Sequence, residues 1–217
     1  MEINNKRDEL LKTARAIAYF QKGQSIVEVE DNSDQSAKLV IGYMETEGEF
    51  AEGLVEAAGY LLFGSQGFDA DVRDKALDMT NKAIQLEPNN EDVLEKALFN
   101  YQYTIGDYPE NREVIVDITD KILDLDPANI QGILSYYLYG KLFNTNFSLQ
   151  KAIGLLEKAR TIDPTRTDVV LDLGTAYAGD HRYNEAIEAY ESYIKMIPED
   201  SLRAQSQINA IREKIHD

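Results

Sequence analysis

Residues 167–200, TDVVLDLGTAYAGDHRYNEAIEAYESYIKMIPED, decide the fold. Val170, Leu173, Gly174 and Tyr177 recur at the i, i+3, i+4, i+7 spacing, which places them on one face of a helix. A second apolar stripe follows, formed by Ala186, Tyr190 and Tyr193, and Pro198 comes after it. The segment therefore predicts two antiparallel helices that approach closely where the small residues lie.

The proline that ends this segment has three counterparts upstream. Four of the five prolines close similar phrases, at spacings of 39, 37 and 34 residues: Pro88, Pro127, Pro164 and Pro198. A proline ends a helix because it cannot continue the hydrogen-bonded turn. A period of 34 to 39 residues with a terminal proline predicts paired helices stacked in a solenoid.

This pattern resembles the tetratricopeptide repeat of bacterial proteins. In that family a small residue on the first helix faces an alanine on the second, with aromatic residues beside them and a proline at the end. Residues 167–200 follow the pattern, except that Tyr193 stands where the family prefers alanine. We therefore expect the contact at Tyr193 to be either looser or shifted.

Three further repeats match with decreasing clarity. Residues 130–166 carry the signature in the same register, with three extra residues, Ile130 to Gly132, lengthening the first helix. The first repeat is counted from Ala57 and departs from the pattern at Gly67. Residues 91–129 match least, with about five extra residues around Gly106–Pro109. The residues carrying the match in the third and first repeats are Tyr136, Tyr139, Gly140, Phe143, Ala152, Leu156, Ala159, Tyr60, Phe63, Gly64, Ala76 and Ala83.

The expected fold is all-α, a right-handed superhelical α-solenoid of about four helix pairs. The pairs span residues 49–90, 91–129, 130–166 and 167–200. Residues 201–217 predict a C-terminal capping helix whose array-facing residues are Leu202, Ile208, Ile211 and Ile215.

Residues 1–48 do not fit the repeat and form an N-terminal extension, either a cap or a separate docking element. We expect helices over 6–22 and 34–45, with Asp34 as an N-cap, and a short strand over 25–30. The buried face of the first of these helices is predicted to hold Leu10, Leu11, Ala14, Ile17 and Ala18.

The composition of the chain excludes several classes of partner and of activity. The 217 residues hold 22 basic and 39 acidic side chains, a net charge of −17, which disfavours nucleic acid and anionic lipid as partners. There is no cysteine and no apolar run long enough to span a membrane. No nucleotide-binding, hydrolase or metalloprotease motif occurs. We expect a protein that is not an enzyme, has no cofactor or metal, and is cytoplasmic, or periplasmic if a leader or anchor has been removed.

Two features leave a choice of interpretation. Asp117, Asp120 and Asp124 share one helix face, which suits either a cation or basic partner, or simply a solvated surface; we favour the surface. His181 follows Gly179-Asp180, where a solvated turn residue is the favoured interpretation.

The family resemblance also implies a binding groove, lined by the first helix of each repeat. The expected lining residues are Asp92, Glu95, Lys96, Phe99, Gln102, Tyr103, Tyr137, Lys141, Asn144, Asp168, Asp172 and Thr175. The same positions in the last two repeats also hold Leu134, Leu138, Thr145 and Leu171. Phe99, Tyr103 and Tyr137 are the expected anchors for an extended or helical peptide, with packing between repeats as an equal alternative for Tyr137.

These observations favour a non-enzymatic scaffold or adaptor that binds a protein or peptide partner in the groove. Acids such as Asp92 and Asp168 lie where co-chaperones that hold acidic tails need bases, so that role is disfavoured. An assembly or export chaperone is the first alternative, because residues 186–208 resemble the repeat domain of bacterial c-type cytochrome biogenesis proteins. The second is a self-assembling scaffold, in which residues 1–48 dock into a neighbouring copy's groove.

Overall fold

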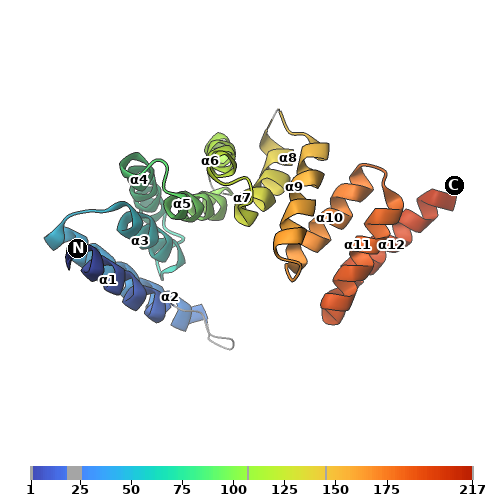
Figure 1. Cartoon of the computed structure of the whole chain (residues 1–217). Coiled ribbons are helices and arrows are strands. Elements are labelled where there is room, and N and C mark those ends of the chain that lie inside the picture. The colour runs from blue at the N-terminus through green and yellow to red at the C-terminus, as the bar shows by residue number, and fades with distance from the viewer. Residues whose placement is uncertain (1, 19–25, 107, 145, 217) are drawn as a thin grey trace. The chain divides into compact units, whose positions relative to one another are not determined.

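The computed structural model describes residues 2–18, 26–106, 108–144 and 146–216. Within these ranges the regular elements are all helical, as the all-α prediction requires. The chain divides into an N-terminal unit, residues 1–118, and a C-terminal unit, residues 119–217, with the boundary inside α6. The α-helices are labelled in Figure 1. The elements are α1 (Glu2–Ala18), α2 (Ile26–Glu47), α3 (Ala51–Phe63), α4 (Ala70–Leu86), α5 (Glu91–Thr104), η1 (Pro109–Asn111), α6 (Arg112–Leu125), α7 (Ile130–Ser135), η2 (Tyr136–Gly140), α8 (Lys141–Phe143), α9 (Leu149–Ile162), α10 (Thr167–Gly179), α11 (Tyr183–Met196), η3 (Pro198–Asp200) and α12 (Ser201–His216).

Helix ends follow the local chemistry of the sequence. Each of the four repeated prolines lies within two residues of the end of α4, α6, α9 or α11, as predicted. The helices that follow begin with side-chain caps in two of these cases. Asn90 Oδ1 accepts a hydrogen bond from the Val93 amide, and Asn129 Oδ1 accepts one from the Gly132 amide. Such caps satisfy amides that have no partner within the helix.

In the C-terminal unit, α10 and α11 pack as predicted. The helices meet at Gly174, where an added Cβ would lie 2.8 Å from ring atoms of Tyr190. Both predicted apolar stripes are buried there. Tyr193 is also buried, and its hydroxyl donates to Asp200, just before α12. The tyrosine that replaces the family's alanine thus ties α11 to the turn that follows it.

The capping helix α12 was predicted only in part. Ala204, Ile208 and Ile211 form its buried stripe. Leu202 is 85% exposed and Ile215 is also exposed, so the prediction that they face the array is wrong. Leu202 precedes Ala204 by two residues, which turns it to the opposite side of the helix.

The third repeat contains a departure from α-helical geometry. Its first helix begins at Ile130, as the extra residues predicted, but Tyr136–Gly140 form a π-helical turn before α8. Tyr136 and Tyr137 are both buried, as are Ile133, Leu134 and Ser135 of the preceding α7, so this helix is enclosed on several sides. The Tyr136 hydroxyl accepts a hydrogen bond from the Ser148 amide at the start of α9.

The register predicted for the first repeat is wrong. Helix α3 begins at Ala51 rather than Ala57, and Gly64 lies in the turn after it instead of at the close helix contact. Ala58 takes that place and packs with Leu62 against Ala76 of α4. The proline of this repeat correctly marks the end of α4, but a longer turn over residues 64–69 shifts the preceding helix by six residues.

The N-terminal extension forms a helical hairpin that packs on α3. Leu11 and Ala14 of α1 are buried, and Ser36 Oγ of α2 donates to the Ala14 carbonyl at 2.8 Å. Residues 26–30 are helical, so the predicted strand is wrong: five alternating residues are too few to distinguish a strand from a helix. Asp34 lies inside α2, and its carboxylate accepts hydrogen bonds from the Ser65 amide and hydroxyl instead of capping a helix. Residues 19–25, the end of one predicted helix and the start of the predicted strand, lie outside the described residues.

Candidate partner-binding surface

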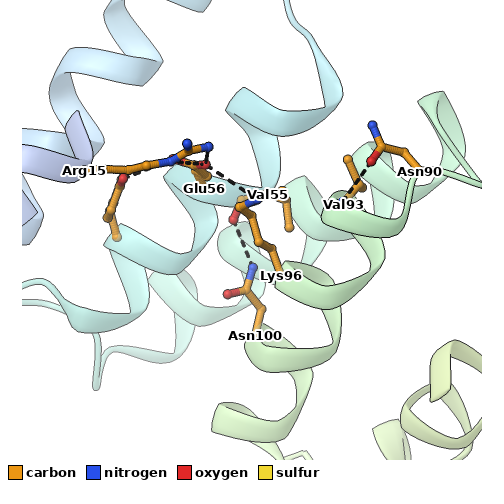
Figure 2. A network of polar contacts seen from close by, with 8 residues as sticks. Arg15, Val55, Glu56, Asn90, Val93, Lys96 and Asn100 are labelled. Carbon is orange, nitrogen blue, oxygen red and sulfur yellow. Dashed lines mark hydrogen bonds and ion pairs between the residues drawn. The ribbon is translucent and has the colours of Figure 1, made fainter. Parts of the chain in front are cut away.

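In the N-terminal unit, α3 and α5 are the first helices of two successive pairs, and they lie in contact. Asn100 of α5 is buried, and its Nδ2 donates to the Val55 carbonyl of α3 at 3.1 Å, as Figure 2 shows. The same nitrogen donates to Thr80 Oγ1 of α4 at 3.0 Å. One side chain therefore fixes three helices together and holds α3 and α5 in register.

A buried carboxylate, Glu56 of α3, joins these helices to the N-terminal hairpin. Its oxygens receive hydrogen bonds from Arg15 of α1, with Nε at 2.8 Å, and from the Tyr60 hydroxyl at 3.1 Å. Lys96 of α5 brings Nζ to within 3.8 Å of it (Figure 2). The hydrogen bond with Glu56 raises the pKa of Arg15, while burial raises the pKa of Tyr60 above its usual range. Lys96, a predicted groove residue, thus already forms an ion pair with the buried Glu56.

Three aromatic rings gather at the C-terminal ends of α3 and α5. The Phe63 ring stacks on Phe99 with centroids 5.7 Å apart and lies 4.6 Å from the Tyr103 ring. Phe99 is 49% exposed and Tyr103 is 40% exposed. We call Phe63, Phe99 and Tyr103 the aromatic cluster. Large apolar rings that stay open to solvent as a group typically mark interaction sites.

Carboxylates lie at the opposite ends of the same two helices. Glu52 of α3 is half-buried, and burial raises its pKa. The negative charges of Glu56 and Asp92 add to that rise, while Lys96 and Arg15 oppose it. Asp92 itself is exposed in the first turn of α5. The other predicted residues of this helix, Glu95 and Gln102, are half-buried.

In the C-terminal unit the structure corrects one predicted anchor. Tyr137 is only 3% exposed and belongs to the hydrophobic core of this unit, so it is not available to a partner. Lys141 is exposed and places Nζ 6.0 Å from the centre of the Tyr137 ring. Asn144 Oδ1 accepts from the Asn146 amide and so stabilises the turn after α8. Thr145, at another position of the expected groove, lies outside the described residues.

The remaining predicted groove residues, Asp168, Asp172 and Thr175, lie on α10, and they differ in their hydrogen bonds and ion pairs. Asp168 forms an ion pair with Arg166, and that hydrogen bond lowers its pKa. Thr175 Oγ1 donates to the Leu171 carbonyl and accepts from the Tyr190 hydroxyl. Asp172 is half-buried; burial, aided by the charge of Asp168, raises its pKa to about 6. Of the three, only Asp172 makes no hydrogen bond or ion pair with another residue that the structure describes.

Of the apolar residues expected on this groove, Leu134 is buried and Leu171 half-buried, whereas Leu138 is exposed. Leu138 is the one apolar member that a partner could reach in this unit, among the groove residues that the structure describes.

The described residues offer no assembled metal site. No group of three or more His, Asp or Glu side chains among them is placed to hold an ion. In the predicted acidic stripe, Asp117 and Asp124 are exposed and Asp120 is half-buried. His181 is exposed in the turn before α11, as expected, with a positive φ of 60° and its Nδ1 2.9 Å from the Tyr183 hydroxyl. None of the described helices is both long and apolar enough to cross a membrane.

Sequence reasoning missed three contributors to the surface on α3 and α5. Phe63 was expected in the repeat core, and Glu52 and Glu56 fell outside the repeat when it was counted from Ala57. With α3 starting at Ala51, all three belong to the groove-lining helix. The signal that could have found them is the Gly64-Ser65-Gln66-Gly67 turn, which cannot lie inside a helix that continues past Gly64.

Comparison with known proteins agrees with this architecture. The sequence model of the tetratricopeptide repeat family matches residues 146–208. No curated protein matches the sequence. MamA from Desulfovibrio magneticus RS-1 is similar in structure, with 14% identity over 88% of this chain and 97% of that one, and a TM-score of 0.59. TTC0263 from Thermus thermophilus has 16% identity over 83% of this chain and 91% of that one, with a TM-score of 0.54.

A third structure is YrrB, which is described as a tetratricopeptide repeat protein with an unusual peptide-binding site. It shares 13% identity over 91% of this chain and 97% of that one, with a TM-score of 0.57. At these identities the likeness establishes the fold alone. The expected link to c-type cytochrome biogenesis gains no support from these matches. Residues 146–208 therefore match the tetratricopeptide repeat by sequence, and the described helices have an all-α helical-repeat fold like that of known tetratricopeptide repeat structures.

Proposed function

We propose that this protein is a non-enzymatic scaffold or adaptor that binds a peptide segment of a protein partner on the exposed face of α3 and α5. The observation that carries the proposal is the aromatic cluster. Two of its rings stay 40% and 49% exposed on helices that are otherwise firmly fixed by Asn100 and Glu56. A rigid base with open rings suits a binding site, because little conformational freedom is lost when a partner docks.

The family context supports the same function. Tetratricopeptide repeats are typically non-enzymatic, and the similar structure of YrrB is described as having a peptide-binding site. In the C-terminal unit, Asp172 of α10 is a predicted groove residue that makes no hydrogen bond or ion pair with another residue that the structure describes. Tyr137 is no longer part of the proposal, since that side chain is buried.

A comparative pull-down from native lysate tests the proposal. The bait is the full chain beside a Phe99→Ala/Tyr103→Ala variant. The control is Leu86→Ala/Leu202→Ala, which also removes two exposed apolar side chains but from α4 and α12. We expect one stoichiometric partner to be retained by the wild type and the control, and lost from the aromatic variant.

The loss should be large, because aromatic anchors at the centre of an interface often contribute at least about 2 kcal/mol each, roughly 30-fold in affinity. Capture of many unrelated clients would favour the chaperone alternative. Equal capture by all three baits would contradict the assignment of the binding face.

A further inference from the structure

We propose that the occupant of the α3–α5 face is an extended, basic peptide segment, in which a large apolar side chain lies three to five residues from a lysine or arginine. The inference rests on the proposed function and specifies its ligand. It comes from three features of one surface: the aromatic cluster, the carboxylates at the other end of the same helices, and the distance between them.

The apolar requirement comes from the aromatic cluster. Phe63 stacks on Phe99 and contacts Tyr103, so the three rings form one continuous apolar surface. Covering this surface with an aliphatic or aromatic side chain removes apolar area from water, which is the main source of affinity in most interfaces. Tyr103 also offers a hydroxyl at the edge, as is common at mixed interfaces.

The requirement for positive charge comes from the electrostatics of the whole unit and of this face. Residues 1–118 hold 24 acidic and 11 basic side chains, a net charge of −13, against −4 for residues 119–217. Glu52 lies close enough to Lys96, Arg15 and Asp92 to interact with them electrostatically, and the two cations offset part of its charge. Neither Glu52 nor Asp92 makes a hydrogen bond or ion pair to another residue that the structure describes. By contrast, Glu56 is already satisfied by Arg15 and Lys96. A cationic side chain would be attracted to the first pair, and an acidic peptide would be repelled.

The spacing follows from helix geometry. Glu52 precedes Phe63 by eleven residues on α3, which at 1.5 Å per residue separates them by about 16 Å along the helix axis. Asp92 precedes Phe99 by seven residues on α5, or about 10 Å. An extended peptide advances about 3.3 Å per residue. Its cationic and apolar side chains should therefore be three to five residues apart.

Selection from a display library of random twelve-residue peptides, on the full chain, tests this inference. We expect enriched sequences to combine a Phe, Tyr, Leu or Met with a Lys or Arg three to five residues away. Enriched peptides that require Phe99 and Tyr103 but lack the basic residue would overturn the inference and leave the proposed function standing. Peptides that bind a Phe99→Ala/Tyr103→Ala variant equally well, or no enrichment at all, would contradict both.

Fluorescence anisotropy with the most enriched peptide then measures the two contributions separately. Glu52→Gln/Asp92→Asn should weaken binding about three- to tenfold and reduce its salt dependence, since partly exposed charge pairs are individually modest. The matched control, Asp71→Asn/Asp78→Asn, removes two exposed carboxylates from α4 and should change affinity less than twofold. If both double variants weaken binding equally, the attraction comes from net charge and the assigned carboxylates are wrong.

Discussion

Asp172 offers a stability test of the groove geometry that needs no partner. Its carboxylate is half-buried on α10, and burial together with the nearby charge of Asp168 raises its pKa from 3.8 to about 6. Arg203 is attracted to it but offsets only part of this effect. An unpaired carboxylate held in this way destabilises the fold at neutral pH, so Asp172→Asn should make the protein more stable.

The sign and size follow from proton linkage. Because the folded pKa lies above the unfolded value, the folded chain holds a proton between about pH 4 and pH 6 that the unfolded chain releases. Stability therefore falls as the pH rises through this window. A pKa difference of about two corresponds to about 3 kcal/mol. Since the group is only half-buried, solvent screening reduces the expected gain to about 1–2 kcal/mol at pH 7.5.

Urea unfolding followed by circular dichroism at pH 7.5 and pH 5.0 measures this effect. The gain from Asp172→Asn should fall to about half at pH 5.0, where the folded wild type is already largely protonated. Asp168→Asn is the matched control on the same helix. It also removes one negative charge, but it breaks the ion pair with Arg166 that lowers the Asp168 pKa, so it should cost about 0.5 kcal/mol.

The comparison separates local from general electrostatics. Both substitutions reduce the net charge of −17 by one unit, and Asp168→Asn also removes the part of the repulsion on Asp172 that Asp168 supplies. Equal stabilisation by both variants at pH 7.5, or a gain from Asp172→Asn that does not change with pH, would show that the burial of Asp172 is not the cause.

Three further predictions concern packing and the polar network. Gly174→Ala should lower the free energy of unfolding in urea by about 1–3 kcal/mol, because the added Cβ would meet the Tyr190 ring at 2.8 Å. Gly154→Ala, where the added Cβ meets no atom, should raise it by about 0.5–1 kcal/mol. Similar effects of the two substitutions would refute the close contact at Gly174. Asn100→Ala should cost about 1–3 kcal/mol by removing two buried hydrogen bonds, and an unchanged urea midpoint would contradict that role. Arg15→Ala should raise amide hydrogen exchange in α1 and leave α10 unchanged; unaltered exchange in α1 would show that its ion pair does not hold the hairpin.

The parts of the fold that the sequence predicted are those set by local chemistry. Pro88, Pro127 and Pro164 end helices wherever they occur, because proline removes a backbone donor regardless of tertiary context. The close approach of two helices at Gly174 was also predictable, although the ring of Tyr190, which it meets, was expected beside that contact. These two signals were enough for the helix pairs of the C-terminal unit.

The wrong predictions arose where the local sequence is compatible with more than one backbone arrangement. The first repeat has its proline in place, but its long turn at residues 64–69 allowed the preceding helix to be counted six residues too late. The π turn at Tyr136–Gly140 could not be recognised, because an apolar stripe fits an α or a π turn equally well over five residues. The first error hid Phe63 as a candidate site residue. Tyr137 was mistaken for an anchor because its helix is buried on several sides, which a repeat pattern does not reveal.

The central claim, that a partner binds on the aromatic cluster, is tested most directly by site-specific photo-crosslinking. A benzophenone amino acid is placed at position 103 in the full chain, and at position 86 on α4 as an exposed control, before irradiation in native lysate. The account predicts one crosslinked species from position 103, competed away by an enriched peptide, and none from position 86. Crosslinks of equal yield from both positions, or crosslinks at position 103 that the peptide does not displace, would contradict it.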